Sequence, residues 1–414
     1  MLKYISTIQL YPLRLRSDEN LWEGEVFGGR QLYTPPVEDF SVPVAVIGGG
    51  ITGALVSHVL VQAGIETAVF EKDKIAGGST IASTSFLQYE TDMTLSGLSQ
   101  KIGEEGARNA YLYCRKAVEL IKNIIAENSL HCNFLEKQSL QFAHNSKMAK
   151  MLEEEYGFRK KIFPEIRYLH QKELLSEFHI KSNGAILSTP SGAMNPVAFT
   201  RQLIENNYQK GLRVFTQTEI KKISNAPGNK KLLLTKTGIR ITCDYLIVCM
   251  GYESFRFIKK CSARLFSTWA IASKENEPLP EIFKDTLFWN TASPYLYFTG
   301  TEKGRIIAGG GDTLFRPVMF TEGLKARKTA LIQKKFRQFI PDYPLEPEIS
   351  WGGVFGSSPD ALPYIGKVND EDNFLAVLGL GGNGIIFSVL GMEIILSAIW
   401  KQHHPLEQYF RPCR

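Results

Sequence analysis

A glycine-rich run near residue 50 constrains this chain more than any other stretch. The run VAVIGGGITGALVSHVL, residues 44–60, places Gly48, Gly50 and Gly53 in the spacing GxGxxG between a strand-like and a helix-like segment. The first glycine permits a tight turn, the second lets backbone approach a pyrophosphate, and the third lets helix and strand pack closely. Free N–H groups at the helix N-terminus then favour the phosphates of a dinucleotide.

The flanking sequence completes a β-α-β unit, with a strand at 43–47, a helix at 51–63 and a strand at 66–71. Glu71 ends the second strand, 18 residues after Gly53, close to the ~20 residues expected for the acid that binds a ribose hydroxyl. A surface glutamate at a strand end is the structural alternative. The fingerprint by itself is shared by NAD and FAD sites.

The charge balance argues against nucleic acid as a partner. The chain has 48 basic and 42 acidic residues, a net charge of +6 over 414 residues, and its basic residues form only short clusters such as 159–161. A nucleic-acid surface needs denser clustering on one face. We therefore expect a globular protein of two or three lobes that acts on small molecules.

Cysteine spacing and the apolar segments bear on location. The six cysteines, at 114, 132, 243, 249, 261 and 413, include no CxxC pair and no zinc-type spacing, so we expect no metal site and a reducing compartment. The N-terminus lacks the apolar core of a signal peptide, which predicts a cytoplasmic location. Residues 375–400 are apolar but interrupted by four glycines, so we expect a strand, a glycine loop and a buried helix there, with no membrane span.

Four motifs in order carry a resemblance to a known family. They are the GxGxxG unit, GGSTIASTSFLQ after Glu71, YLIVCMGYES, and the C-terminal pair WGGVFGSSPDALPYIG and GLGGNGIIF. Together they resemble the FAD-dependent oxidoreductases of the D-amino acid oxidase superfamily, the group of glycine oxidase, sarcosine oxidase and γ-glutamylputrescine oxidase. The resemblance covers most of residues 43–400 and favours FAD over NAD.

The resemblance implies a fold as well. It is an α/β fold, with a discontinuous Rossmann-like FAD-binding domain and an α+β substrate domain built on a mixed or antiparallel sheet. We expect an N-terminal arm at 1–40, the FAD-binding domain at 41–100, 185–255 and 346–414, and the substrate or cap domain at 101–184 and 256–345. The sequence predicts no particular oligomeric state.

Carried onto this sequence, the family pattern implies a set of FAD-binding residues. Binding is expected to be non-covalent, because Ser357 and Ser358 lie where sarcosine oxidases use a cysteine. The expected residues are Gly48, Gly50, Ile51, Thr52, Gly53, Glu71, Lys72, Gly78, Ser79, Thr80, Ser83, Thr84, Ser85, Leu87, Ile220, Cys249, Gly251, Gly353, Gly381, Gly382, Asn383, Gly384 and Ile385.

Two departures from the family bear on the substrate and the electron acceptor. Phe355 stands where relatives that oxidise amino acids have an arginine for the substrate carboxylate, a task suited to a planar fork of donors. Either another cation, Arg305 or Arg264, replaces it, or the substrate is not a simple α-amino acid. Ile307 stands where sarcosine oxidases place a lysine over the flavin, so the acceptor is O2 or another compound.

The expected activity is oxidation of a CH–NH bond of an amine or N-substituted amino acid. A hydride passes to flavin N5, and the imine product hydrolyses in water. Phe355, Gln88 and Arg305 are the candidate catalytic residues. Two alternatives stay open: a 2-hydroxy-acid dehydrogenase, which would need a histidine base, and a flavin-binding protein without turnover.

Overall fold

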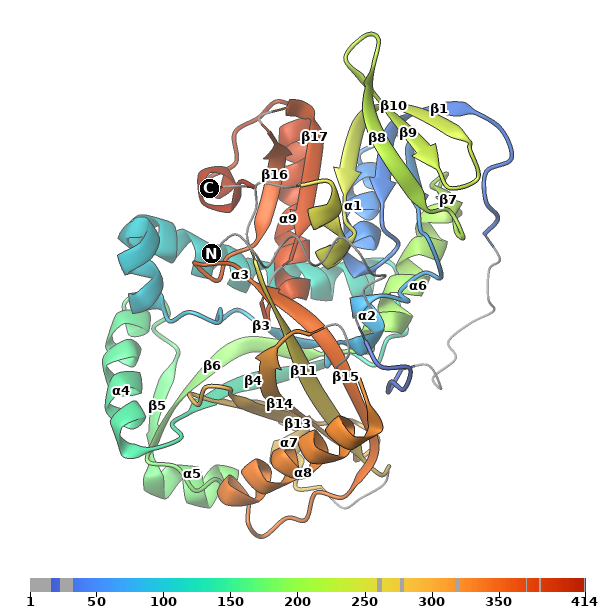
Figure 1. Cartoon of the computed structure of the whole chain (residues 1–414). Helices are drawn as coiled ribbons and strands as arrows, with labels where there is room; N and C mark the ends of the chain where they lie inside the picture. Colours follow the sequence, from blue (N-terminus) through green and yellow to red (C-terminus); the bar gives the residue numbers. More distant parts are fainter. Residues whose placement is uncertain are drawn as a thin grey trace.

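Two large β-sheets organise the chain, and helices cover them (Figure 1). The computed structural model describes residues 16–22, 33–258, 263–275, 279–316, 320–369, 371–379, 381–412 and 414. Cys261, Cys413 and much of the expected arm, residues 1–15 and 23–32, lie outside the described residues. The expected fold class, α/β with a second lobe built on a mixed sheet, is confirmed.

The first sheet has eight strands and forms around the glycine-rich unit. Its main order is β16-β17-β10-β1-β2-β7, while β9 pairs with β10 and β8 with β9. Neighbours from β17 to β7 run parallel, and residues 44–47 are buried on both faces, as parallel strands require. The strands are β1 Phe40–Ile47, β2 Thr67–Phe70, β7 Arg213–Phe215, β8 Ile220–Ala226, β9 Lys230–Thr235, β10 Arg240–Val248, β16 Tyr364–Val368 and β17 Glu371–Leu378.

Apolar helices pack against one face of this sheet. The helices α1 and α9 contact each other there, α6 packs on α1, and α3 packs on α9. A separate apolar cluster fills the opposite face, beneath the β8–β9 hairpin. The helical segments of this part are α1 Ile51–Gln62, α2 Ser79–Ala82, α3 Leu95–Glu127, α6 Pro196–Tyr208, α9 Gly384–Ile399, α10 Glu407–Phe410 and the 3-10 turn η1 Gly251–Arg256.

The second sheet has nine strands and forms the other lobe. Its order is β15-β11-β14-β13-β12-β4-β6-β3, with β5 paired to β6, and only the β12–β4 pair is parallel among the described pairs. Its strands are β3 Phe86–Gln88, β4 Leu135–Phe142, β5 Arg167–His170, β6 Gly184–Ala193, β11 Arg264–Ser273, β12 Thr286–Asn290, β13 Leu296–Gly300, β14 Ile306–Leu314 and β15 Pro347–Ser357, and its helices are α4 Ser146–Lys160, α5 Gln171–Phe178, α7 Glu281–Asp285 and α8 Glu322–Phe339.

Sheet membership departs from the expected domain division at three strands. β3, β6 and β15 fall inside ranges assigned to the FAD-binding domain, yet all three pair within the nine-stranded sheet. β15, for example, pairs along its length with β11. β3 and β15 carry motif residues that indicated the cofactor, whereas all three strands pair with strands far away in the sequence. The domain boundaries themselves stay a prediction.

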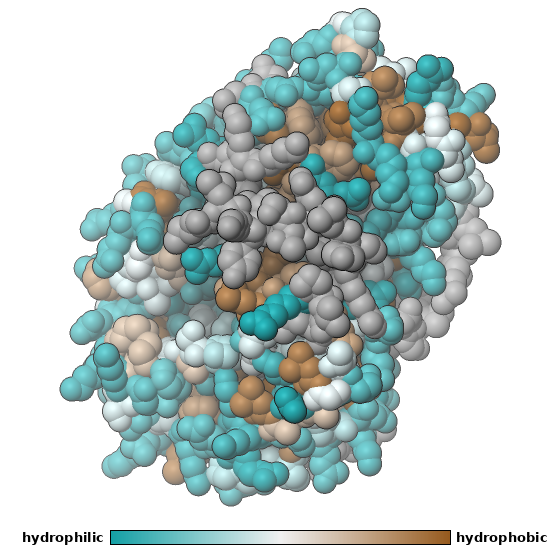
Figure 2. Space-filling view, viewed as in Figure 1, coloured by the Kyte–Doolittle hydropathy of each residue, from teal (hydrophilic) through white to brown (hydrophobic). Residues whose placement is uncertain are grey.

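The apolar C-terminal segment folds as a strand, a loop and a buried helix. β17 and α9 occupy this segment, α9 has 16 residues, and it packs between the first sheet and α3. Within the described residues, no helix has the length and apolarity that crossing a bilayer requires. Hydrophilic side chains dominate the molecular face shown in Figure 2.

Candidate functional site

The glycine-rich loop has no room for larger side chains. Gly48 has φ of +113°, and a Cβ built there would lie 2.4 Å from the Cys249 carbonyl oxygen. A Cβ on Gly53 would lie 1.9 Å from the Gly48 carbonyl oxygen. Both positions therefore require glycine, and α1 begins directly against the ends of β1 and β10.

A cavity of about 630 Å³ begins at this loop and reaches the nine-stranded sheet. Its wall comes from segments far apart in the sequence, including the loop after β1, the segment around α2, the end of β10, and the start of α9. All the expected FAD-binding residues line it except Gly53 and Leu87. Phe355 and Gln88 line it as well.

The loop end of the cavity fits a dinucleotide. Glu71 accepts hydrogen bonds from the Gly49 N–H to Oε2, at 2.7 Å, and from the Asp73 N–H to Oε1, at 2.9 Å. These bonds fix its carboxylate beside the loop, although burial raises its pKa. The N-cap residue Gly50 has no side chain, and the Ile51 N–H donates to Thr80 Oγ1 at 3.0 Å. The following N–H groups of the first turn of α1 are suited to bind phosphate oxygens.

The start of α9 is tied to the segment after β3. Asn383 donates from Nδ2 to the carbonyl oxygens of Gln88, at 3.1 Å, and Glu90, at 2.6 Å. Gly381 has φ of +76°. These contacts direct the N-terminus of α9 toward the cavity, where its dipole favours negative charge on a bound group.

Aromatic side chains line the cavity where it meets the nine-stranded sheet. We call this the aromatic end, defined by Trp289, Tyr295, Tyr297 and Phe355. The Phe355 ring stacks on Phe266, with 5.4 Å between centroids and 21° between planes. Phe355 therefore both packs against a neighbouring strand and faces the cavity.

An N-terminal segment also contributes to the cavity wall. Arg16 lines it and donates from Nε to the Gly77 carbonyl oxygen at 2.9 Å. Ser17 and Gly352 exchange backbone and side-chain hydrogen bonds, and Trp22 donates from Nε1 to the Ser83 carbonyl oxygen at 2.7 Å. Residues 16–22 are thus hydrogen-bonded to both the α2 segment and β15.

Loss of the Arg16 side chain is expected to weaken FAD binding. Its guanidinium lies beside Gly77, close to the first turn of α1 and the α2 segment, where the pyrophosphate is expected. We expect Arg16→Ala to lower FAD affinity about 3- to 10-fold, as for a partly exposed charge contact, and Arg16→Lys to lower it less. Titration of apoprotein with FAD at low and high salt measures this. Equal affinities of all three proteins would mean that Arg16 acts only on the fold.

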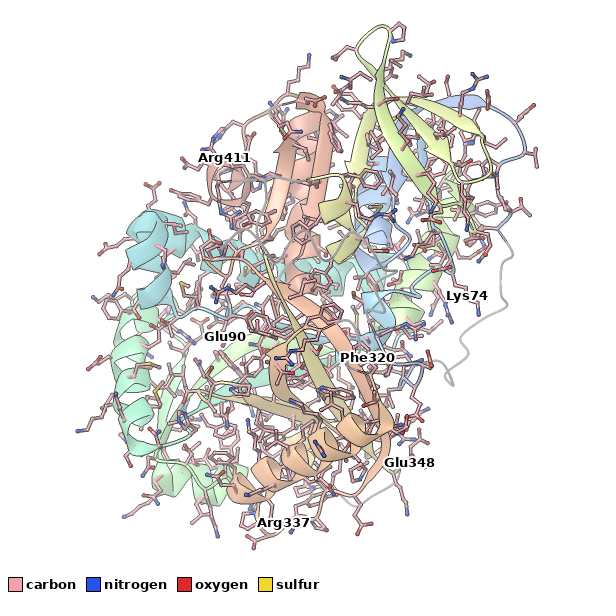
Figure 3. All side chains as sticks on the ribbon, in the orientation of Figure 1. Lys74, Glu90, Phe320, Arg337, Glu348 and Arg411 are labelled. Carbon is pink, nitrogen blue, oxygen red and sulfur yellow. The ribbon has the colours of Figure 1, made fainter. Side chains whose placement is uncertain are left out.

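Three expected site residues, Arg305, Leu87 and Gly53, do not line the cavity. Arg305 pairs with Glu275, at 3.3 Å, and with Glu348, and Glu348 lies at the outer edge of the second lobe in Figure 3. Arg305 lies directly before β14, where its side chain is directed toward these acids, so the structure gives no support to its candidacy as a substrate-binding cation. Leu87 packs into the main core, since β3 alternates and presents Phe86 and Gln88 to the cavity. Arg264 is exposed and does not line the cavity either.

Gly53 acts by packing, as its place in the motif predicted, and not by lining the cavity.

Several cavity residues were missed from the sequence. Arg16 precedes every recognised motif, and Asp92 and Gln141 belong to none of them. Trp289 and Tyr295 stood out as aromatic residues, yet their spacing did not show which face they occupy. Only the pairing of β12 with β4 and β13 brings these residues to one end of the cavity.

Solved structures share this architecture, and a relative matches most of the chain in sequence. The crystal structure of glycine oxidase from Geobacillus kaustophilus aligns with a TM-score of 0.75 at 19% identity, covering 90% of this chain and 99% of that one. The crystal structure of L-proline dehydrogenase from P. horikoshii aligns with a TM-score of 0.74 at 19% identity, covering 91% of this chain and 98% of that one. The Bacillus subtilis (strain 168) protein named "Putative Rieske 2Fe-2S iron-sulfur protein YhfW" is 23% identical over 394 residues, 91% of this chain and 72% of its own.

The family is shown by a match along most of the chain. The sequence pattern of the family described as "FAD dependent oxidoreductase" matches residues 43–395. This range runs from β1 into α9 and contains the glycine-rich loop, both sheets and nearly the whole cavity wall. The chain belongs to this family of FAD-dependent oxidoreductases.

Proposed function

We propose that this chain uses non-covalently bound FAD to oxidise the CH–NH bond of an amine or N-substituted amino acid. One observation carries the proposal. Among the described residues that line the cavity, the cations are Arg16, Lys72 and Arg256, none of which lies on a strand of the nine-stranded sheet, and none of the lining residues is a histidine. The aromatic end is therefore suited to an amine, because no protein cation on the sheet repels the amine nitrogen there. Removal of a hydride from the α-carbon of a neutral amine needs no protein base.

The chain's own groups bind and orient the substrate in this proposal. FAD, when bound, supplies the chemistry by accepting a hydride equivalent from the substrate carbon. The rings of Phe355, Tyr295 and Trp289 exclude water from the reacting carbon, and Gln88 offers an amide at the edge of β3. The N-terminus of α9 favours negative charge that builds up beside it.

The 2-hydroxy-acid alternative has less support from this site. A hydroxyl substrate needs a base for its proton, and histidine is the usual one. None of the described residues that line the cavity is a histidine. The other alternative, a flavin-binding protein without turnover, predicts that no compound bleaches the flavin in the titration below.

Anaerobic titration of the purified holoprotein tests the proposal. Panels of amines, N-methyl amino acids, α-amino acids and 2-hydroxy acids are added while flavin absorbance is followed. Bleaching by amines or N-substituted amino acids is expected. Bleaching only by 2-hydroxy acids, or by no compound, would overturn the proposal. The electron acceptor is then identified during turnover. Oxygen uptake indicates O2, whereas reduction of an added dye without oxygen uptake indicates another compound.

A charge introduced at Phe355 should change ligand preference. Phe355→Arg places a guanidinium on the cavity wall, and a charge-assisted pair with a small carboxylate is expected to tighten its binding at least ~10-fold. Acetate-induced shifts of the flavin spectrum give the dissociation constants. Phe355→Leu, which removes the ring without adding charge, should show no such gain. A Phe355→Arg variant without tighter carboxylate binding would contradict the placement of Phe355 at the substrate.

A further inference from the structure

An unpaired carboxylate lies at the aromatic end of the cavity. Asp92 follows β3 and precedes α3, and its exposed side chain faces the cavity. Its Oδ2 accepts a hydrogen bond from the Gly382 N–H at 2.9 Å. No cation pairs with it within the described part of the chain, and desolvation by the surrounding protein raises its pKa. A ligand that fills the cavity would bury this carboxylate, and buried carboxylates are normally paired.

A second acceptor without a partner lines the same cavity. Gln141, on β4, is only 5% exposed. Its Oε1 has no hydrogen-bond partner among the residues that the structure describes. Buried amide oxygens normally accept a hydrogen bond from protein, water or ligand. Asp92 and Gln141 thus offer acceptors to a ligand, and a ligand that supplies N–H donors would satisfy both.

Aromatic and acidic neighbours reinforce a preference for positive charge. A Cβ built on Gly382 would lie 2.8 Å from Asp92 Oδ1 and 3.2 Å from the Tyr295 hydroxyl, so both groups surround this glycine. Aromatic faces attract cations. Asp312, on β14, is close enough to interact with Asp92, and burial raises its pKa to about 6. Lys328 and Lys335 on α8 interact with Asp312 and donate to the carbonyl oxygens of Gly311 and Pro294, and neither of them pairs with Asp92.

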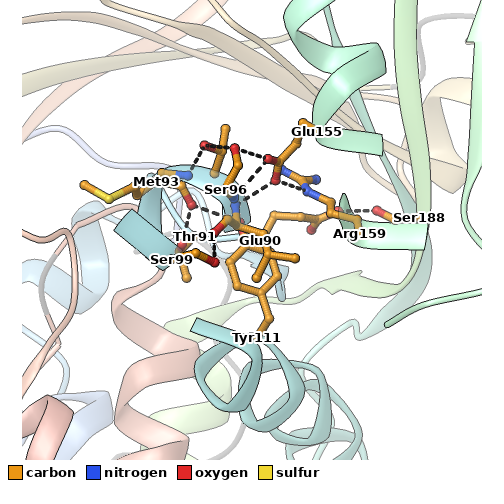
Figure 4. A network of polar contacts seen from close by, with 12 residues as sticks. Glu90, Thr91, Met93, Ser96, Ser99, Tyr111, Glu155, Arg159 and Ser188 are labelled. Atoms are coloured by element: carbon orange, nitrogen blue, oxygen red, sulfur yellow. Dashed lines mark hydrogen bonds and ion pairs between the residues drawn. The ribbon is translucent and has the colours of Figure 1, made fainter. Parts of the chain in front are cut away.

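Buried side chains hold the segment that carries Asp92 (Figure 4). Glu155 accepts hydrogen bonds from the N–H groups of Leu95, at 2.7 Å, and Ser96, at 3.1 Å. Tyr111 donates from its hydroxyl to the Met93 carbonyl oxygen at 2.9 Å. On the other side of Asp92, the Glu90 backbone is bonded by Asn383. The carboxylate is therefore fixed in place before any ligand binds, which lowers the entropic cost of binding.

We propose that Asp92 and Gln141 bind a second, non-reacting nitrogen of the substrate, which is positively charged, so that the substrate is a diamine or larger polyamine without a carboxylate. This rests on the proposed oxidation at a CH–NH bond. Pairing with a carboxylate favours the charged form of an amine, whereas the reacting nitrogen must be neutral. Asp92 is thus suited to the remote nitrogen, and the same charge repels substrates that end in a carboxylate.

Three matched series of compounds test this on the holoenzyme. They are α,ω-diamines of three to five carbons, the monoamines of equal length, and the corresponding ω-amino acids. Dissociation constants come from anaerobic shifts or bleaching of the flavin absorbance. In the wild type, the best diamine is expected to bind at least ~10-fold more tightly than its monoamine and tighter still than its ω-amino acid, as charge-assisted bonds imply.

Variants at the two acceptors separate charge from hydrogen bonding. Asp92→Asn keeps an acceptor for the Gly382 N–H and removes the charge, so it should weaken diamine binding ~10- to 100-fold and weaken monoamine binding by less. Gln141→Leu should weaken diamine binding ~3- to 10-fold, because one hydrogen bond to the diamine is lost. Asp342→Asn, an equal change of net charge at an exposed position of the same lobe, should have no effect.

Failure of this inference differs from failure of the proposed oxidation. If the wild type binds diamines no better than monoamines, or Asp92→Asn leaves the diamine preference intact, the Asp92 site is wrong even though amines still bleach the flavin. If diamines bind in an Asp92-dependent manner yet no amine bleaches the flavin, the binding site stands and the proposed oxidation is wrong.

Discussion

Gly53→Ala is expected to remove FAD from the protein. The added methyl group would lie 1.9 Å from the Gly48 carbonyl oxygen and 3.0 Å from its carbon, and both are backbone atoms that no rotamer change can move. Overpacking of this kind costs ~3 kcal/mol or more, which corresponds to a loss of at least ~100-fold in FAD affinity if the strain falls on the loop. FAD content after purification and titration of the apoprotein measure the loss.

A second glycine provides the matched control for this variant. Gly157 lies in α4, and a Cβ built there meets nothing within 4 Å. Gly157→Ala should therefore retain full FAD content and an unchanged or slightly higher melting temperature. A Gly53→Ala protein that unfolds at a lower temperature and lacks FAD would agree with the close contact between the added methyl group and the Gly48 backbone. Gly53→Ala with wild-type FAD affinity and melting temperature would contradict the geometry of the loop.

Arg159→Met is expected to destabilise the fold by about 3–5 kcal/mol. Arg159 and Glu155 are 0% and 1% exposed and form an ion pair of 2.7 Å between Nε and Oε1. Removal of the guanidinium leaves the Glu155 carboxylate buried without its cation, at the N-terminus of α3. Since domains are stable by roughly 5–15 kcal/mol, denaturant unfolding should show a large shift of the midpoint.

A double variant separates the uncompensated charge from lost packing. Glu155→Gln keeps an oxygen acceptor for the α3 N-terminus and removes the negative charge. Combined with Arg159→Met, it should recover at least ~1 kcal/mol relative to Arg159→Met alone. An Arg159→Met protein within ~0.5 kcal/mol of the wild type, the range of ordinary surface changes, would contradict the structural importance of this pair.

Local sequence patterns predicted the cofactor end of the site well. GxGxxG, Glu71 and the GGNG turn specify backbone geometry within a few residues, so the β-α-β unit and the start of α9 could be located from spacing alone. The apolar run of β17 and α9 was likewise read correctly, because glycines at the turn interrupt it.

The substrate end depended on long-range pairing that the sequence does not reveal. Arg305 seemed available as a cation, but its pairing with Glu275 and Glu348 follows from the packing of β14 beside β11. Asp92 lies in no motif, and its contact with Gly382 spans 290 positions. β3 and β15 carry motif residues of one lobe while pairing in the sheet of the other.

Anaerobic reduction of the holoprotein by an amine labelled at its α-carbon tests the central claim most directly. The account predicts that a diamine bleaches the flavin absorbance, and that deuterium at the reacting α-carbon slows this reduction while deuterium elsewhere does not. Aldehyde from hydrolysis of the imine should appear in an amount equal to the flavin reduced. Reduction by 2-hydroxy acids with no response to any amine, or reduction that is indifferent to α-deuteration and yields no aldehyde, would contradict the account.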